Sequence, residues 1–262
     1  MRVLSLGAGV QSSTLLLMGV HGELQIDRAI FADTQWEPKA VYDWLETLMS
    51  ISERAGIHVD VVTGGNLRAD ALAGVEKSQA WLPLHTANLQ GAPTMLRRQC
   101  TANYKIRPIR RRLRQLGFGP RRPVTQIIGI SLDEAIRMRT PDVAYVQHEY
   151  PLIDRRMTRA ACVRWLADHG YPEPPKSSCL GCPFKSDRQW RELRDGPGDE
   201  WEQTVEFDAA VRHARERFAG VYLHRSLVPL PMVDLSTQQD AGQMEMFDGG
   251  ECDGFSCMGS AV

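Results

Sequence analysis

Residues 2–17 read RVLSLGAGVQSSTLLL, and this stretch decides the fold. The run from Arg2 to Leu6 predicts a short buried strand, and the small residues from Gly7 to Val10 predict a loop. Leucines follow at helical spacing, so a helix is expected to begin near Gln11. Free backbone N–H groups at the start of a helix favour a bound phosphate. Any tight turn between a strand and a helix uses glycine, so the loop alone leaves nucleotide binding open.

Further apolar runs alternate with helical patterns through the first half of the chain. Strands are expected at 29–32, 58–62 and 124–130, and a helix over 38–55. Such alternation predicts an α/β fold with a parallel, doubly wound sheet and helices on both faces. Ligands of these sheets lie beyond the carboxyl ends of the strands. Residues 76–93 show no clear period, and we expect an active-site loop or lid there.

A proline-rich connector, YPEPP at 171–175, breaks the helical pattern of residues 158–169. We therefore predict a nucleotide-binding α/β domain over 1–170. Residues 171–262 are predicted to be a helical, cysteine-bearing C-terminal segment packed on that domain. One of its helices should begin near Ser186, capped by Ser186 or Asp187, and another should cover 201–218.

Bulk composition excludes some classes of protein. The formal net charge of -1 gives no global argument for nucleic acid or membrane. No apolar run approaches the roughly 18 residues that a membrane span needs, so we expect no membrane partner and a cytoplasmic location. The six cysteines would then face a reducing compartment, where metal binding or redox chemistry is more common than stable disulfides. A homodimer is the oligomer we consider.

Several motifs together carry a resemblance to a known family. SLGAGVQSS at 5–13 resembles the PP-loop of ATP pyrophosphatases and phosphosulfate reductases, with Gly7 in the usual serine place and Gln11 in the aspartate place. FADTQWEP at 31–38 resembles the Asp-Thr segment that lies near the nucleotide. The remaining matches are RQCT at 98–101, KIRP at 105–108, GISLDE at 129–134, YPLID at 150–154 and CLGCPF at 179–184. The chain is thus similar to the phosphoadenosine phosphosulfate reductase-like family of the PP-loop, adenine nucleotide alpha hydrolase-like superfamily.

The resemblance implies a site for ATP, or another adenine nucleotide, with Mg²⁺. Asp33, Lys105 and Arg107 would supply charge or metal contacts where negative charge develops. The hydroxyl groups of the two loop serines either donate to a phosphate or cap the helix. The nucleotide-binding residues implied are Ser5, Gly7, Ala8, Gly9, Gln11, Ser12, Ser13, Asp33 and Thr34.

Cysteine spacing indicates a metal site. Cys179 and Cys182 stand two residues apart, which allows both sulfurs to reach one metal, and Cys100, Cys252 and Cys257 are candidates for further ligands. Spacing leaves zinc and an iron–sulfur cluster open. The resemblance favours a 4Fe-4S cluster, held by Cys100, Cys179, Cys182 and Cys252. Cys100, beside two arginines, is alternatively a nucleophile, and Cys162 is expected to be a buried core residue.

A basic stretch suggests the partner. No acidic residue occurs between Lys77 and Leu132, whereas ten basic residues crowd the part of that interval from Arg97 to Arg122. Nucleic acid (tRNA or DNA), the phosphates of a nucleotide and a solvated helix surface remain alternatives. The segment His224–Ser226 is a further candidate for phosphate contact. The basic residues are Arg97, Arg98, Lys105, Arg107, Arg110, Arg111, Arg112, Arg114, Arg121 and Arg122.

Three hypotheses of function follow. The first is an ATP-dependent enzyme that adenylates a substrate oxygen, with sulfur then transferred to a nucleic acid or nucleotide by way of the cluster. The second is a reductase of phosphoadenosine phosphosulfate or adenosine phosphosulfate, in which a cysteine thiolate attacks sulfur. The third is a nucleotide-binding module with a structural metal and no turnover, which the glutamine in the loop favours.

Overall fold

The structure is a computed structural model, and it describes residues 1–74, 82–88, 91–212 and 220–236. The chain divides into two compact units. Of the described residues, the first comprises Met1–Gly64 and Thr101–Ser178, and the second comprises those within Gly65–Cys100 and those from Cys179 to Ser236. Among the described residues, no helix combines the length and the apolar character that crossing a membrane requires.

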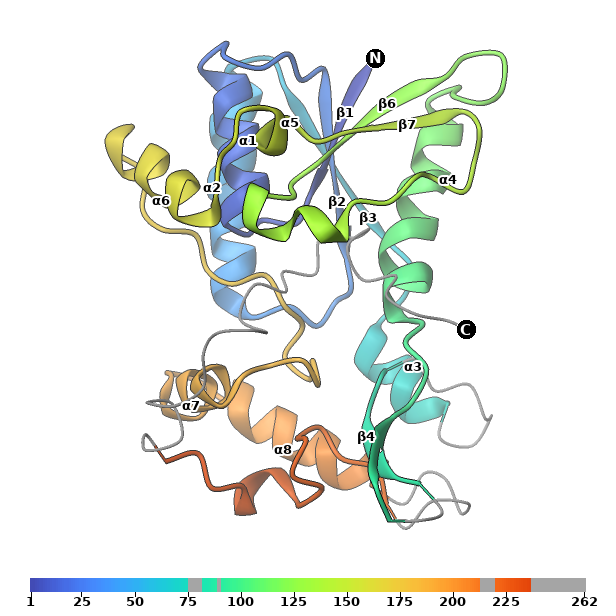
Figure 1. The fold of residues 1–262 in the computed structure, drawn as a ribbon, viewed down its shortest axis with the longest axis vertical. Helices are drawn as coiled ribbons and strands as arrows, with labels where there is room; N and C mark the ends of the chain where they lie inside the picture. Colours follow the sequence, from blue (N-terminus) through green and yellow to red (C-terminus); the bar gives the residue numbers. More distant parts are fainter. Residues whose placement is uncertain (75–81, 89–90, 213–219, 237–262) are drawn as a thin grey trace. The chain divides into compact units, whose positions relative to one another are not determined.

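The first unit is built on a five-stranded sheet. Its strands are β1 (Arg2–Leu6), β2 (Arg28–Asp33), β3 (His58–Thr63), β6 (Val124–Ile128) and β7 (Val146–Glu149). They lie in the order β3-β2-β1-β6-β7, and every neighbouring pair is parallel. Figure 1 shows β1 at the centre of this sheet. Parallel strands require crossovers, which here are mostly helical.

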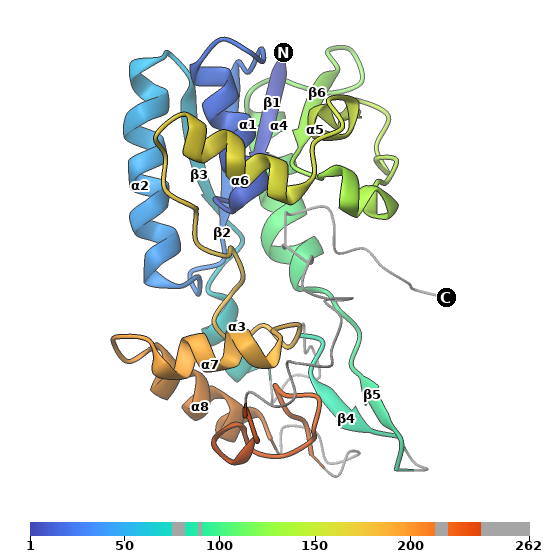
Figure 2. The ribbon, with the colours of Figure 1, turned by 60° about the vertical axis from the view of Figure 1, so that its left-hand side comes forward.

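Helices cover both faces of the sheet. On one face lie α1 (Val10–Val20), α2 (Lys39–Arg54) and α6 (Arg159–Asp168), whose apolar side chains form one core cluster with the sheet. On the other face lies α4 (Arg107–Gln115), which contributes to a second cluster. Figures 1 and 2 both show α4 opposite the three-helix group. The predicted doubly wound α/β class is therefore confirmed.

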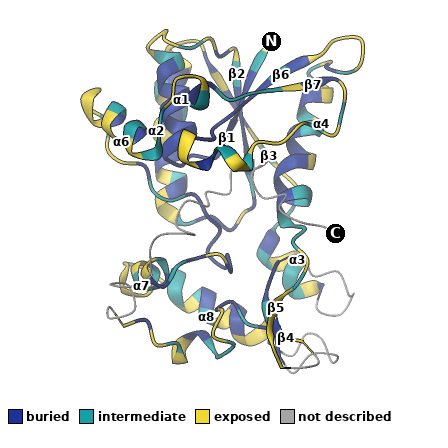
Figure 3. Cartoon of the chain, in the orientation of Figure 1, coloured by how far each residue is buried: buried dark blue, intermediate teal, exposed yellow. Residues whose placement is uncertain are grey.

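The order of the strands identifies the edge of the sheet at which a ligand is expected. From β1 the chain moves through β2 to β3, and then crosses back to β6 on the other side of β1. Order reverses between β1 and β6, and crevices at such a reversal are where open α/β sheets bind ligands. The loop after β1 and the segment after β6 both begin there. Figure 3 shows α1, which starts from that loop, as buried over most of its length.

Short elements complete the first unit. The π-helix η1 (Thr101–Ile106) leads directly into α4, and the 3-10 helix η2 (Leu132–Arg137) follows β6. A short helix, α5 (Pro151–Asp154), follows β7, and α6 then begins after Thr158, whose side chain caps it. Cys162 lies on α6 and is fully buried in the first core cluster, as expected from the sequence.

The second unit holds α3 (Leu67–Ala73), α7 (Asp187–Asp195), α8 (Glu200–Val211) and the 3-10 helix η3 (Leu230–Met232). It also holds a small antiparallel ribbon of β4 (His85–Ala87) and β5 (Pro93–Met95). Trp190 of α7 and Phe207 of α8 are fully buried. Ser186 caps α7 in a capping box, as predicted.

Two features of this architecture differ from the sequence-based expectation. The predicted boundary near residue 170 assigns all of 65–100 to the first domain, whereas these residues belong to the second compact unit. The interval 76–93 was expected to be a loop, but β4 lies within it, because backbone pairs join His85 to Tyr222 as well as to Met95. Contacts between such distant residues leave no local periodicity. Residues 75–81 and 89–90 lie outside the described residues.

Candidate functional site

The loop after β1 makes a tight, buried turn into α1. Ala8 has φ of 59°, a left-handed conformation that is uncommon for a residue with a Cβ. Gly9 is the N-cap of α1, and no side chain caps this helix. The first turn of any α-helix has N–H groups without intrahelical partners, so this end of α1 can donate to an anion.

The serine hydroxyl groups of α1 hold the loop in place. Ser12 Oγ accepts a hydrogen bond from the Gly7 N–H at 3.1 Å and donates to the Gly9 carbonyl at 3.4 Å. Ser13 Oγ accepts from the Trp44 indole at 2.9 Å. The expectation that these hydroxyls cap the helix is therefore wrong, while phosphate contact stays a prediction.

Gln11 connects the loop to the segment after β6. Its side-chain amide nitrogen donates to Glu134 at 3.1 Å and lies 3.4 Å from the Ser131 hydroxyl. Its amide oxygen is buried and has no hydrogen-bond partner in the described part of the chain. A buried acceptor without a partner is costly, so a donor on a bound ligand or a water molecule would stabilise this side chain.

Beneath the loop, Ser5 of β1 is also buried. Its hydroxyl accepts a hydrogen bond of 2.5 Å from the side-chain amide of Gln126, on the neighbouring strand β6. Ser5 thus joins the two strands between which the strand order reverses, and it lies just before the loop that follows β1.

The carboxyl end of β2 presents Asp33. One of its carboxylate oxygens accepts from the Gln35 N–H at 2.7 Å and from the Tyr42 hydroxyl at 2.8 Å. Gln35 adopts a left-handed φ of 56°, which folds the backbone back toward this carboxylate. Burial raises the pKa of Tyr42 well above its ordinary value, and the neighbouring Asp33 charge adds to the effect. Tyr42 is therefore a hydrogen-bond donor at any physiological pH, and it fixes the Asp33 carboxylate.

A buried ion pair lies beside Thr34. Lys105 of η1 and Glu37 are 9% and 1% exposed, with Nζ 3.5 Å from Oε1. Thr34 donates its hydroxyl to the same Glu37 oxygen at 3.1 Å. The approach of η1 depends on Gly64, because a Cβ there would lie 2.7 Å from the Asn103 carbonyl oxygen. Lys105 is thus brought to the end of β2, whereas Arg107 is exposed at the start of α4.

The structure therefore unites most of the residues predicted for nucleotide binding. The loop from Gly7 to Ser13 and the segment from Asp33 follow β1 and β2, two adjacent parallel strands. Sequence reasoning assigned no role to Glu37, Tyr42 or Glu134, which carry the polar contacts of the predicted residues. Glu37 and Glu134 stand inside the family-like motifs, so their position in those motifs was the available signal.

The predicted metal ligands lie in the second unit, as far as the structure describes them. Cys179 and Cys182 are buried on one turn, in which the Cys182 N–H donates to the Cys179 carbonyl at 3.1 Å. His85 contacts this turn through its Nε2, 3.2 Å from the Pro183 carbonyl. Burial, together with the charges of nearby His224 and Arg225, lowers the pKa of His85. The imidazole is therefore neutral at pH 7 and donates to the carbonyl.

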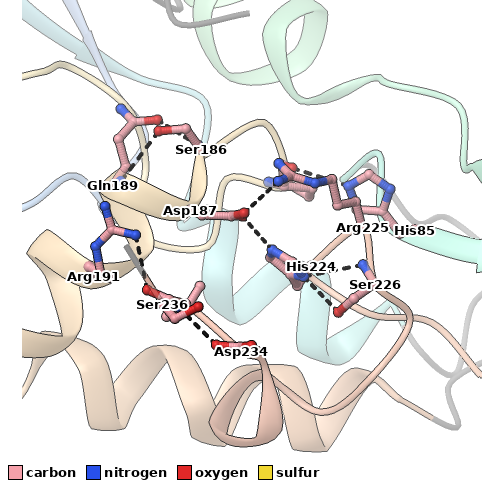
Figure 4. Close-up of polar contacts among 12 residues, drawn as sticks. His85, Ser186, Asp187, Gln189, Arg191, His224, Arg225, Ser226, Asp234 and Ser236 are labelled. Atoms are coloured by element: carbon pink, nitrogen blue, oxygen red, sulfur yellow. Dashed lines mark hydrogen bonds and ion pairs between the residues drawn. The ribbon is translucent and has the colours of Figure 1, made fainter. Parts of the chain in front are cut away.

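A second polar cluster of this unit surrounds Asp187, the first residue of α7. The carboxylate lies between His224 Nε2, at 2.8 Å, and the Arg225 guanidinium, at 2.5 Å, as Figure 4 shows. His224 is buried and its Nδ1 lies 2.7 Å from the Ser226 hydroxyl. The charge of Asp187 is thus matched within the cluster. These contacts tie the segment at 224–226 to α7, and its predicted phosphate contact stays a prediction.

The described residues supply only part of a metal centre. Within them, no three His, Cys, Asp or Glu side chains are grouped closely enough to hold a metal ion, so Cys100 does not complete a set with the Cys179–Cys182 pair. A four-cysteine cluster or a structural zinc needs three or four ligands. Cys252 and Cys257 lie outside the described residues. The described ligands alone do not fit a cluster, and we derive no reaction step through one.

Comparisons with known proteins give a likeness of fold. No family model matches the chain, and no curated protein matches it. Among solved structures, phosphoadenylyl-sulfate (PAPS) reductase from Candida auris, in a phosphate complex, is 13% identical over 66% of this chain and 74% of that chain, with a TM-score of 0.45. The U34-tRNA thiolase NcsA from Methanococcus maripaludis, with its 4Fe-4S cluster, is 14% identical over 79% of this chain and 70% of that chain, with a TM-score of 0.37.

The fold that the resemblance of the motifs implies, a parallel α/β sheet with flanking helices, is the one observed. The class defined by the site is an α/β protein with a glycine-containing loop and a buried lysine at the ligand edge of its sheet.

Proposed function

We propose that this chain is an ATP-dependent enzyme of the PP-loop type that adenylates an oxygen atom of its substrate. The observation that carries the proposal is the edge of the sheet in the first unit. There α1 begins after β1, Asp33 ends the adjacent strand β2, and the buried Lys105 of η1 pairs with Glu37 just beyond β2. These are a phosphate-binding helix end, a carboxylate and a fixed positive charge. A nucleotide transfer reaction needs all three.

In the proposed reaction the substrate oxygen attacks the α-phosphorus of ATP. The bond from that phosphorus to the bridging oxygen breaks, and pyrophosphate leaves with its electron pair. The product carries AMP on the substrate oxygen, which turns a poor leaving group into a good one. Negative charge grows on the pyrophosphate, so the α1 N–H groups and Lys105 would act there. Mg²⁺ enters bound to the nucleotide phosphates, with Asp33 as its carboxylate contact.

A sulfide-level sulfur donor would then attack the carbon that bears the adenylated oxygen, on a nucleic acid or nucleotide. The C–O bond would break, and AMP would leave with that oxygen and the electron pair, so that sulfur takes its place. The buried Cys179–Cys182 pair supports a metal or sulfur-handling role for the second unit. An iron–sulfur cluster completed by Cys252 is part of the proposal, with zinc as its alternative. No step above depends on which metal is bound.

The test is measurement of pyrophosphate release and ATP binding in wild type and in Asp33→Asn. Asparagine keeps an oxygen for the Gln35 and Tyr42 hydrogen bonds but removes the charge, so the fold should persist. We expect ATP still to bind and turnover to fall by roughly a hundredfold or more, since removing a single hydrogen-bond donor to a transition state already costs about that much. Asp43→Asn, at an exposed carboxylate on α2, is the matched control and should change nothing.

Two outcomes would exclude adenylation. ATP binding without pyrophosphate release, with every acceptor tried, would leave the non-catalytic nucleotide-binding module. Release of sulfite from phosphoadenosine phosphosulfate with a thiol reductant, and no reaction with ATP, would establish the reductase alternative.

A further inference from the structure

One face of α4 carries a row of exposed arginines. Arg107, Arg111 and Arg114 are spaced by four and three residues, which places them on the same side of the helix. At a rise of about 1.5 Å per residue, the row extends over roughly 10 Å along the helix axis. We call these three residues the arginine row.

Neighbouring arginines of α4 are neutralised by acidic partners. Arg110 pairs with Asp142, and Arg112 donates to Asp60 at 2.9 Å. Within the part of the chain that the structure describes, the arginine row makes no ion pair, and Arg114 lies over the Tyr145 ring at 5.8 Å. The helix thus has two kinds of arginine: those that fasten it to the unit and those whose charge faces solvent.

The positive surface continues beyond the helix. Arg121 and Arg122 are exposed in the turn after α4, and Arg122 lies 4.7 Å from the centre of the Phe118 ring. The sequence between Lys77 and Leu132 contains no acidic residue, so no carboxylate of this stretch itself offsets these charges. A row of charges along a helix fits the repeated phosphates of a strand better than the converging phosphates of one nucleotide.

Exposed apolar side chains stand on η2, and the chain beyond η2 pairs with α4 at Asp142. Ile136 is 88% exposed, and Leu132 and Met138 are 39% and 41% exposed, all in or next to η2. The same segment continues to Asp142, which holds α4 through Arg110. Apolar side chains in water suit unstacked bases, which offer flat apolar faces.

We propose that the arginine row binds the phosphate backbone of an RNA with an unpaired loop, whose bases lie toward the exposed side chains of η2. The choice of RNA rests on the proposed function, because a base oxygen of a nucleic acid can be adenylated only when it is out of its pair. Folded RNA displays unpaired bases in its loops, whereas the bases of duplex DNA must first be extruded. The pattern of paired and solvent-facing arginines does not depend on the proposed function, because it follows from the structure alone.

The experiment compares binding of a fluorescein-labelled RNA hairpin with that of a DNA duplex of equal length, by fluorescence anisotropy over a series of salt concentrations. The test variant is Arg111→Gln with Arg114→Gln, which leaves Arg107 in place. The matched control is Arg54→Gln with Arg164→Gln, two exposed arginines on helices that cover the other face of the sheet. ATP binding is measured on every preparation.

We expect the test variant to bind the hairpin roughly fivefold to thirtyfold more weakly at low salt, as the loss of two exposed ion contacts implies. The slope of log affinity against log salt should fall by about 1.4, near 0.7 for each lost phosphate contact. The control variant should match wild type, and duplex DNA should bind more weakly than the hairpin.

Equal loss in the control, or an unchanged salt slope in the test variant, would overturn the assignment of this surface. Tighter binding of duplex DNA would overturn the choice of RNA. In either case intact ATP binding and pyrophosphate release would leave the proposed function standing. Conversely, hairpin binding that depends on Arg111 and Arg114 in a chain that binds no ATP would refute the proposed function and keep the binding surface.

Discussion

The buried pair of Lys105 and Glu37 makes the sharpest prediction about stability. Replacing Lys105 by Met leaves the Glu37 carboxylate 1% exposed and without its nearest positive charge. Breaking a buried pair in this way costs about 3–5 kcal/mol, because the remaining charge is desolvated and poorly compensated. The separation of 3.5 Å is not that of a tight contact, so we expect a value at the lower end of this range.

The pair of Lys39 and Asp43 on α2 is the control. Its charged atoms are closer, at 2.6 Å, but the two side chains are 79% and 59% exposed. Solvent screens such a pair, and Lys39→Met should cost no more than about 0.5 kcal/mol. If distance governed the energy, the order of the two effects would be reversed.

The assay is urea unfolding followed by far-ultraviolet circular dichroism, for Lys105→Met, Glu37→Gln and the double variant. The double variant should recover most of the loss, because it contains neither buried charge, and the coupling energy should then exceed about 2 kcal/mol. A loss below about 1 kcal/mol for Lys105→Met, or a double variant no more stable than the single one, would refute burial as the source of the effect.

Three further predictions concern the same two units. Burial by itself would raise the pKa of Asp60, but hydrogen bonds from its two arginine partners outweigh it and leave that pKa lowered. Asp60 should therefore stabilise the fold above its unfolded pKa of about 3.9. In urea unfolding measured at a series of acid pH values, the difference in stability between wild type and Asp60→Asn should shrink as pH falls below about 5. A difference that does not depend on pH would contradict this. Gly64→Ala should lower stability by about 1–3 kcal/mol in the same urea assay, since the new Cβ meets a backbone oxygen that cannot rotate away. Anaerobic purification with metal analysis should find about four irons per chain in wild type and fewer in Cys179→Ala, whereas one zinc without colour would exclude the cluster.

Local patterns in the sequence predicted four of the five strands of the first unit, but not β7, and they indicated the edge of the sheet at which a ligand is expected. The strand at Arg2–Leu6, the loop after it and the helix with Leu15 to Leu17 could be predicted because each has a short-range signal. Alternating strands and helices then implied a parallel sheet, and the motifs singled out Asp33 and Lys105, whose chemical roles stay a prediction. The capping box at Ser186 is likewise local.

Only the tertiary structure decided what depends on contacts between distant residues. Gln11 contacts Glu134 across 123 positions, and Glu37 contacts Lys105 across 68, so neither partner could be assigned from spacing in the chain. The assignment of residues 65–100 to the second unit has the same cause, because β4 pairs with Tyr222 as well as with β5.

The arginines of α4 show most clearly which properties the sequence determines and which the tertiary structure decides. The number of these arginines, their positive charge and the absence of acidic residues nearby in the chain can all be read from the sequence. Which of them are neutralised depends on Asp60 and Asp142, which folding brings to the helix from other parts of the chain. Charge is a property of composition, but the charge that remains available to a partner is a property of the folded surface, because ion pairs form wherever the fold brings opposite charges together.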